Sequence, residues 1–176
     1  MDRSRKKLRR TIVNTIGIVV VVAAAAVLIS VLLLPVLRIY GASMKGTLDN
    51  GDLVVSVKGT KFKTGDIIAF YYNNDILVKR VIGSSKDWVE VDRDGNVFVN
   101  QQLVEEPYLK EKSYGEQYTD IAMPYQVPEG KVFVMGDNRS ISIDSRNSKI
   151  GCISSEQVVG KIVFRIWPLS KFGTVR

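Results

Sequence analysis

The chain has 176 residues, 45% of them hydrophobic, and carries a formal net charge of +7. This length suffices for one ordinary globular domain and one membrane segment, and it leaves little room for a second large domain. Histidine is absent, which excludes Ser-His and Cys-His catalytic pairs. The single cysteine, Cys152, excludes an intrachain disulfide and a cysteine-rich zinc site. Acid-base chemistry must therefore depend on Lys, Asp, Glu or Tyr.

The positive charge is concentrated at the N-terminus. Six basic residues and one acidic residue fall within positions 1–10, so this tail carries five of the seven net positive charges. The remainder is nearly balanced, which argues against a nucleic-acid partner. A basic tail directly before an apolar run is typical of the inner flank of a membrane anchor, because cationic residues stay on that side and contact anionic lipid. We therefore expect residues 1–10 to form a cytoplasmic tail.

Residues 11–34 are predicted to form a transmembrane helix. The run from Ile12 to Leu34 is almost entirely Val, Ile, Leu and Ala, and it is long enough to cross the ~30 Å hydrocarbon layer with some tilt. A removable secretion signal usually has a shorter apolar core that ends in small residues, whereas here the alanines at 23–26 lie in mid-run. We therefore favour a retained anchor that Pro35 ends, with residues 35–176 outside the cytoplasm.

The pattern after Pro35 predicts a mostly β, antiparallel domain. Short runs rich in Val, Ile, Phe and Tyr are separated by Gly, Asp and Asn clusters, as expected for strands joined by turns. These runs occupy residues 52–58, 66–72, 75–83, 87–101, 131–137 and 158–167. The only helical signal is a possible turn around residues 154–159.

One part of this domain is expected to be less regular. Asp94-Gly95-Asn96 predicts the tight turn of a hairpin. From Gln101 to Gly130, charged residues, Pro and Tyr replace clean alternation. Residues from about 88 to 131 are therefore predicted to form a looser hairpin and cap excursion.

Two residues are candidates for nucleophilic chemistry. Ser43 lies in the small-residue stretch GASMKGTLDNGDLVV, and without histidine its plausible base is a neutral lysine. A lysine becomes neutral near pH 7 only where burial removes its hydration. Lys79 qualifies, because ILVKRVIG is typical of a strand that is covered on both faces. Each residue also has a purely structural interpretation, Ser43 as a turn residue and Lys79 as an edge-strand side chain that reaches solvent.

A third cluster of polar residues follows the predicted strand KVFVM. In MGDNRSISIDSRNSKIG, residues 135–151, two aspartates, two arginines and several serines are crowded into a short loop. Such a loop is either a solvated set of weak ion pairs or a scaffold that orients a catalytic group.

Taken in order, four segments resemble the conserved boxes of type I signal peptidases. They are GASMKGTLDNGDLV, GDIIAF, LVKRVIG and VFVMGDNRSISIDSRNSKIG, and the ending RIWPLSKFG is similar to the single-anchor form of Gram-positive bacteria. The resemblance runs from the anchor to the C-terminus. It implies an antiparallel β-sheet catalytic domain behind one transmembrane helix, located on the extracellular face of the cell membrane. It also implies a Ser-Lys serine endopeptidase that needs no cofactor and no metal.

The resemblance implies a role for each polar residue of these boxes. Ser43 would be the nucleophile and Lys79 the general base. Ser142 would hydrogen-bond the Lys79 amine and fix its direction. The supporting ion pairs would be Asp144 with Arg146 and Asp137 with Arg80. The Ser43 backbone N–H would stabilise the oxyanion.

The implied substrate is the signal peptide of an exported preprotein, cut at Ala-x-Ala sites beside the lipid bilayer. It would lie extended between two strands, in a β-addition mode, against shallow pockets that accept small side chains. The residues implied to contact it are Leu37, Ile39, Tyr40 and Met44 on one side and Leu77 and Val78 on the other. The sequence does not define an oligomeric state or particular preproteins.

Two positions depart from the family pattern. Gly46 replaces the usual proline of the serine box, and Gly41 stands where some members carry a serine that assists the oxyanion site. Gly46 is the one hint of an alternative, a non-catalytic or specialised signal-peptidase-like protein for surface-fibre (pilin) assembly. A self-cleaving Ser-Lys regulator is a further alternative, which the anchor and the lack of a DNA-binding segment disfavour.

Overall fold

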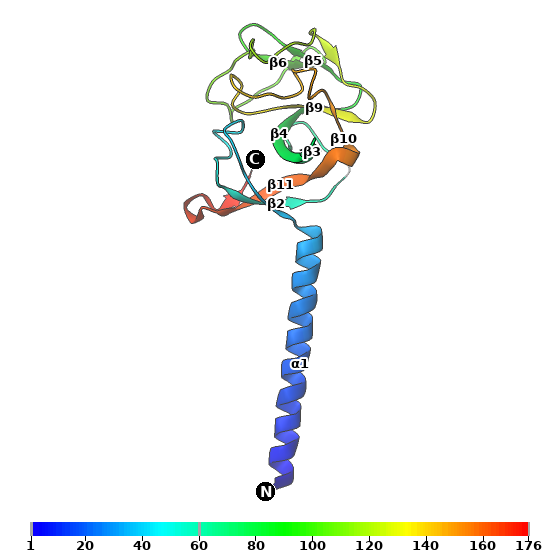
Figure 1. The fold of residues 1–176 in the computed structure, drawn as a ribbon, viewed down its shortest axis with the longest axis vertical. Coiled ribbons are helices and arrows are strands. Elements are labelled where there is room, and N and C mark those ends of the chain that lie inside the picture. The colour runs from blue at the N-terminus through cyan, green and yellow to red at the C-terminus, as the bar shows by residue number, and fades with distance from the viewer. Residues whose placement is uncertain (1, 60, 176) are drawn as a thin grey trace. The chain divides into compact units, whose positions relative to one another are not determined.

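The computed structural model describes residues 2–59 and 61–175. It divides into two compact units, Met1–Pro35 and Val36–Arg176. The first contains one helix and the second contains all of the strands described (Figure 1). This order of elements confirms the predicted fold class, a mostly β, antiparallel domain preceded by one apolar helix.

Helix α1 spans Asp2–Leu33. It begins earlier than the predicted start at residue 11, because Arg, Lys and Leu in the basic tail are good helix formers. It ends at Leu33, since the position directly before Pro35 disfavours the helical conformation. Within the helix, Arg9–Leu28 has a mean hydropathy of 2.5 and is long and apolar enough, by length and composition, to cross a membrane.

The larger sheet of the β domain has eight strands. In spatial order they are β1 (Val36–Arg38), β2 (Leu53–Val57), β11 (Val158–Trp167), β3 (Ile67–Tyr72), β4 (Asp75–Gly83), β9 (Lys131–Met135) and β10 (Ile153–Ser154), and β12 (Gly173–Thr174) pairs with β11. Every pairing is antiparallel. Two short 3₁₀ helices flank β11, η1 (Ser155–Gln157) and η2 (Leu169–Lys171), and η1 lies where the sequence indicated a helical turn.

A second sheet of four strands lies in the region expected to be a looser excursion. Its order is β7 (Gln102–Leu103), β6 (Val97–Val99), β5 (Trp88–Val91) and β8 (Tyr125–Gln126). The pairing of Val91 with Val97 forms the hairpin predicted from Asp94-Gly95-Asn96. Residues 104–124 contain neither helix nor strand. In Figure 1 this sheet, marked by β5 and β6, lies beyond β9, on the far side of the domain from β2 and β11.

Three buried clusters make up the core of the β domain. One contains Ile39, Met44 and Leu48 together with residues of β2, β3 and β11, so it fixes the segment that follows β1. A second joins β9 and the inner end of β4 to the smaller sheet. The third lies on the opposite face of β3 and β4. Strand β4 therefore has apolar packing on both faces, as its sequence predicted.

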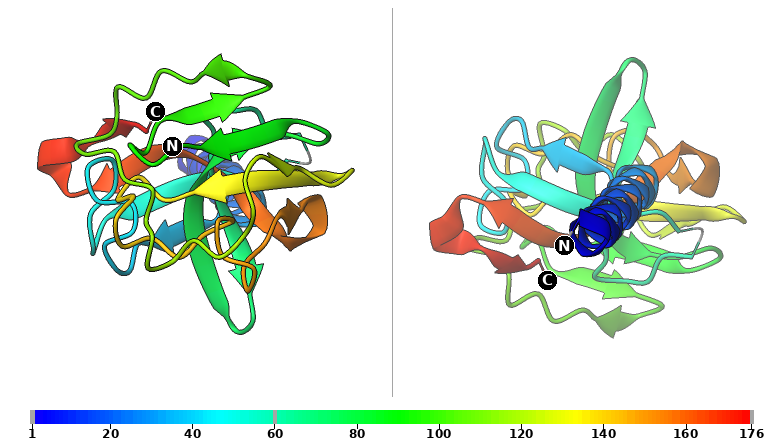
Figure 2. Two further views of the ribbon diagram at one scale, coloured as in Figure 1. Left: turned by 90° about the horizontal axis from the view of Figure 1, so that it is seen from above. Right: turned by 90° about the horizontal axis from the view of Figure 1, so that it is seen from below.

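The open edges of the larger sheet include two strand segments, one in β1 and one in β4. Strand β1 is the last strand on its side and pairs only with β2. Strand β4 pairs with β3 from Asp75 to Arg80, but β9 pairs only with its inner end, between Arg80 and Gly83. The outer half of β4 therefore has no strand on that side among the described residues. Both views of Figure 2 show the β3–β4 hairpin projecting from the β domain.

Candidate active site

Ser43 lies in a compact turn that follows β1. The Lys45 N–H donates to the Ala42 carbonyl at 3.1 Å, and the Leu48 N–H donates to the Met44 carbonyl at 2.8 Å. Met44 and Leu48 are 2% and 0% exposed, which fixes the turn to the core. Ser43 itself stays half-buried and open to one side.

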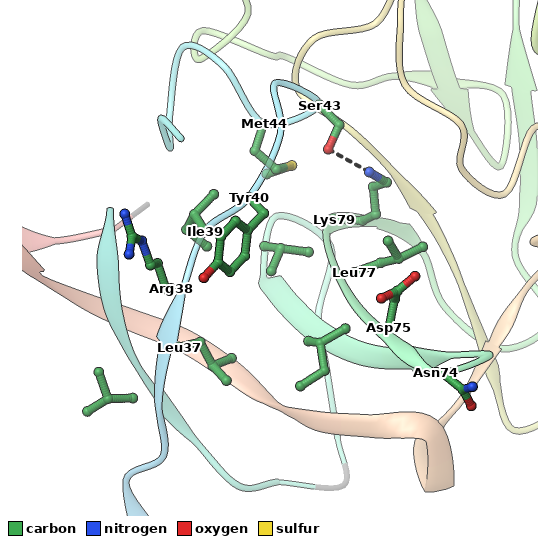
Figure 3. Close-up of a pocket in the computed structure, with 13 residues that line it drawn as sticks. Leu37, Arg38, Ile39, Tyr40, Ser43, Met44, Asn74, Asp75, Leu77 and Lys79 are labelled. Atoms are coloured by element: carbon green, nitrogen blue, oxygen red, sulfur yellow. Dashed lines mark hydrogen bonds between the residues drawn. The ribbon is translucent and has the colours of Figure 1, made fainter. Parts of the chain in front are cut away.

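Lys79 lies in the middle of β4, opposite Ile68 of β3, and is 3% exposed. Burial of the amine lowers its pKa from 10.5 to about 8, and this desolvation is the largest cause. Nearby Arg146 lowers the pKa further, whereas the carboxylates of Asp144 and Asp137 raise it. The Lys79 Nζ donates a hydrogen bond to Ser43 Oγ at 2.7 Å (Figure 3). When neutral, the same amine is in position to accept the hydroxyl proton.

A groove of about 560 Å³ opens beside these two side chains (Figure 3). One wall consists of residues 36–40 with Met44, and the other consists of residues 74–79; we call it the β1–β4 groove. All of the residues that the resemblance implied for substrate binding line it, namely Leu37, Ile39, Tyr40, Met44, Leu77 and Val78. Val78 packs against the cluster that contains Ile39 and Met44, and we call these three residues the apolar floor of the groove.

The loop after β9 packs backbone against backbone on the Ser43 turn. The Asn138 N–H donates to the Ser43 carbonyl at 2.9 Å, and Asn138 Nδ2 donates to the Ala42 carbonyl at 3.1 Å. A Cβ atom on Gly136 would lie only 2.6 Å from the Ser43 carbonyl oxygen. Only glycine therefore lets the loop approach the Ser43 turn this closely.

Both ion pairs that the resemblance implied are present and buried. Arg80 contacts Asp137 through two hydrogen bonds of 2.9 and 2.7 Å. Arg146 likewise contacts both oxygens of Asp144, at 2.8 and 2.9 Å. Burial alone would raise the pKa of Asp144, but the charge and hydrogen bonds of Arg146 hold it below its ordinary value. Two further bonds, from the Gly136 N–H to Asp144 and from Arg80 to the Gly65 carbonyl, tie these pairs to the backbone.

Ser142 does not make the expected hydrogen bond to the Lys79 amine. Its Oγ is buried and has no hydrogen-bond partner among the described residues. The Ser142 N–H donates to the Asn138 carbonyl at 3.1 Å, which holds the residue in the loop. A Cβ atom on Gly136 would overlap the Ser142 hydroxyl. The Ser142 hydroxyl therefore lies against Gly136, and the Lys79 amine donates to Ser43 Oγ.

Sequence reasoning missed a further buried ion pair beside this loop. Arg139 and Glu106 form an ion pair in which both side chains are 0% exposed. The Tyr108 hydroxyl donates to Glu106 at 2.6 Å, and the Arg80 guanidinium lies 3.7 Å from the Tyr108 ring centroid. Arg139 also donates to the Gly136 carbonyl at 3.0 Å. The pairing partners lie 33 positions apart in the chain, so no local pattern joined them.

The conformation of Gly46 explains one departure from the family pattern. Its φ is +116°, which is accessible to glycine and incompatible with the φ of about −65° that proline requires. The turn in this chain therefore follows a path that the family's usual proline could not adopt. The site has no obvious metal ligands, since the described residues contain no group of three His, Cys, Asp or Glu side chains placed to hold an ion.

Comparison with known proteins places the chain among signal peptidases. A family model described as "Signal peptidase, peptidase S26" matches residues 10–167. Signal peptidase IB of Staphylococcus aureus is 40% identical over 152 residues, which cover 76% of this chain and 78% of that protein. Thylakoidal processing peptidase 1 of Arabidopsis thaliana chloroplasts is 41% identical over 146 residues, which cover 73% of this chain but only 41% of that longer protein.

One solved structure also matches part of the chain. The crystal structure of a signal peptidase I from Enterococcus faecalis is 36% identical in sequence and aligns with a TM-score of 0.47, covering 57% of this chain and 96% of that one. The family model spans most of the sequence, including both Ser43 and Lys79. The chain belongs to the signal peptidase family, peptidase S26.

Proposed function

We propose that this protein is a membrane-anchored serine endopeptidase that cleaves signal peptides from exported preproteins, with Ser43 as nucleophile and Lys79 as general base. The hydrogen bond of 2.7 Å between the buried Lys79 amine and Ser43 Oγ carries this proposal. A serine alcohol is a weak nucleophile until a base removes its proton. In a chain without histidine, an amine with a lowered pKa supplies that base.

The proposed reaction begins with neutral Lys79. Its amine accepts the proton of Ser43 Oγ as the oxygen attacks the carbonyl carbon of the scissile peptide bond. The resulting ammonium then donates a proton to the leaving amine, and a water molecule hydrolyses the acyl-enzyme with the same lysine as base. The positive charge on Lys79 is transient during this reaction. It is stabilised by Asp144 and Asp137, whose carboxylates favour the protonated amine.

The proposed oxyanion site is the Ser43 backbone N–H. This N–H has no hydrogen-bond acceptor among the described residues, whereas the Ser43 carbonyl accepts a hydrogen bond from the Asn138 N–H. A preorganised N–H that is free to donate is what a tetrahedral oxyanion requires. Gly41 provides no side-chain donor, so any second donor must come from elsewhere on the turn.

The proposed substrate mode is strand addition in the β1–β4 groove. Both walls have an open strand edge, at β1 and at the outer half of β4, and both strands run toward the dyad. An extended peptide can therefore hydrogen-bond to backbone on either side. The floor formed by Ile39, Met44 and Val78 is apolar, which suits the uncharged, apolar side chains of an Ala-x-Ala site.

We also propose that the Glu106–Tyr108 segment supports the site. Glu106 neutralises Arg139, and Tyr108 stacks on Arg80 while its hydroxyl donates to Glu106. These contacts connect Arg139, in the loop after β9, to Arg80, which is next to Lys79 on β4. Their role is positioning, because neither side chain lines the groove.

The proposed topology places the N-terminus in the cytoplasm and residues 36–176 on the extracellular face. It rests on the basic residues before Ile12 and on the apolar helix segment Arg9–Leu28. Ser43 lies only nine positions beyond Leu34, so even an extended connection spans at most about 30 Å. The nucleophile would then remain close to the bilayer surface from which signal peptides emerge.

The dyad is tested by Ser43→Ala and Lys79→Met in the full-length protein. Each should reduce cleavage of a preprotein with an Ala-x-Ala site by roughly a thousandfold or more, because attack requires both groups. The measurement is the rate of mature-protein formation, with the new N-terminus sequenced. Ser140→Ala and Lys58→Met, at exposed positions outside the groove, serve as matched controls and should retain activity. Substantial cleavage by either dyad variant contradicts the assignment.

Measuring the folding stability of the Lys79→Met variant distinguishes a catalytic role of the amine from a structural one. Below pH 8 the Lys79 amine is protonated in both folded and unfolded states, so the burial cost behind the pKa shift is fully present. This cost is on the order of 3 kcal/mol, and it disappears as pH rises toward the unfolded pKa. Lys79→Met should therefore be inactive yet at least as stable as the wild type at pH 7. A large loss of stability would instead indicate a structural role for the amine.

The pH profile tests the protonation state of the base. Because only neutral Lys79 accepts the serine proton, kcat/KM should rise with pH through about 8 and then level off. Below pH 7 it should fall about tenfold for each pH unit. The measurement is peptide cleavage between acidic and alkaline buffers at constant ionic strength. A profile that is flat across this range rules out Lys79 as the titrating base.

The supporting role of Glu106 is tested by Glu106→Gln against its exposed neighbour, Glu105→Gln. Removing the Glu106 charge leaves Arg139 buried without its counter-ion, which should cost about 3–5 kcal/mol of folding stability and reduce kcat. Thermal unfolding and steady-state kinetics measure both effects. The double variant Glu106→Gln with Arg139→Met removes both charges and should recover much of the stability. Equal stability of the two single variants would contradict this interpretation.

The proposed topology is tested by protease accessibility in intact cells. Protease added outside should digest the β domain, whereas an epitope tag before Asp2 should stay protected until the membrane is permeabilised. Digestion of the tag with protection of the β domain would reverse the orientation.

A further inference from the structure

We propose that Asp75 forms a distal recognition site in the β1–β4 groove, which favours a basic side chain in the substrate about four to six residues before the cleaved bond and disfavours an acidic one. This inference rests on the proposed function, because it requires a signal peptide to occupy the groove.

Asp75 lies at the end of the groove wall that is remote from Ser43. It is the first residue of β4 and is exposed. Figure 3 shows Asp75, Leu77 and Lys79 along this wall, with the Asp75 carboxylate beside Leu77. Alternate residues of a strand project to the same face, so the carboxylate and the proposed base lie on one side of β4.

The Asp75 carboxylate is available for an external partner. No described residue forms an ion pair or a side-chain hydrogen bond with it. The only other charged residues that line the groove are Arg38 and Lys79. Arg38 belongs to the opposite wall, with its guanidinium 5.6 Å from the Tyr40 ring centroid, and Lys79 is buried at the dyad. The outer part of the β4 wall therefore carries one uncompensated negative charge.

A paired strand, rather than a loose loop, presents this charge. Tyr72 of β3 pairs with Asp75 directly at the hairpin turn, and the β3–β4 hairpin projects from the β domain (Figure 2). On its other edge, Asp75 belongs to the half of β4 that β9 leaves unpaired. A peptide added to that edge must pass this carboxylate.

Strand geometry gives the distance between Asp75 and the cleaved bond. Asp75 precedes Lys79 by four residues on β4, which corresponds to roughly 13 Å at about 3.3 Å per residue. An extended substrate has about the same rise per residue. If its last residue before the cleaved bond contacts the dyad, a residue four to six positions before that bond lies beside Asp75, depending on the stagger between the strands.

The expected effect is moderate and depends on salt. An exposed ion pair contributes little, so we expect roughly a two- to fivefold change in kcat/KM for one substrate charge. Screening acts over about 10 Å at 0.1 M salt and about 3 Å at 1 M. The preference should therefore largely disappear at 1 M NaCl, whereas recognition by the apolar floor should remain.

The test uses full-length protein in detergent and peptides that share one Ala-x-Ala site. At each of positions −4, −5 and −6, the peptide carries Lys, Ala or Glu, and kcat/KM is measured at low and high salt. Wild type should prefer Lys over Ala and Ala over Glu at one of these positions. Asp75→Asn should remove that preference, and Asp75→Lys should reverse it. Asp94→Lys, which changes net charge equally but lies in the β5–β6 turn, should behave as the wild type.

The outcomes separate this proposal from the proposed function. Equal cleavage of all the peptides by the wild type, or a preference that persists in Asp75→Asn, overturns the distal site while leaving the peptidase assignment intact. A preference that Asp94→Lys also loses would indicate a general charge effect and likewise overturn the site. Failure to cleave even the neutral peptide overturns the proposed function itself.

Discussion

The burial of one amine is the constraint on which the site depends. Lys79 is 3% exposed and its pKa is lowered to about 8, mainly because the amine has lost its hydration. In water the same group would be charged at neutral pH and useless as a base. Apolar clusters on both faces of β4 maintain this desolvation. Lys79 thus lowers the stability of the folded protein, and the same residue is the proposed general base.

The ion pairs around the amine explain how Lys79 can be buried and still act as the proposed base. Asp144 and Asp137 favour the ammonium form, whereas Arg146 opposes it, so the pKa is lowered without being driven far below neutrality. Both carboxylates are themselves held by bidentate arginines. Arg139 and Glu106 add a further neutral pair. Fixed charges of both signs therefore surround the dyad, and little rearrangement is needed when a proton moves.

The larger sheet places the proposed base and the proposed recognition groove on the same two strands. Strand β1 leads directly into the Ser43 turn and β4 carries Lys79, and the same strands form the walls of the groove. Their open edges and apolar floor suit the extended, apolar peptide of the proposed substrate mode. The groove continues past the apolar floor to Asp75 at the hairpin, so in the proposed distal site the length of β4 as well as pocket shape would enter recognition.

The sequence by itself determined the apolar helix, the strand segments, the β5–β6 hairpin and the family. Each of these depends on local periodicity, on turn residues or on motifs that are contiguous in the chain. The resemblance also implied the two ion pairs that the structure contains, Asp144 with Arg146 and Asp137 with Arg80. The hydrogen bond that the resemblance implied between Ser142 and the Lys79 amine is not among those of the described residues, where the Ser142 hydroxyl lies against Gly136.

Only the tertiary structure decided which distant groups meet. The contact of Ser43 with Lys79, the pairing of Glu106 with Arg139 and the stacking of Tyr108 on Arg80 join residues from separate segments. The desolvation of Lys79 and the open edge at Asp75 likewise depend on which strands pair and where they stop pairing. Burial and strand order are properties of the whole fold, and no local pattern of residues encodes them.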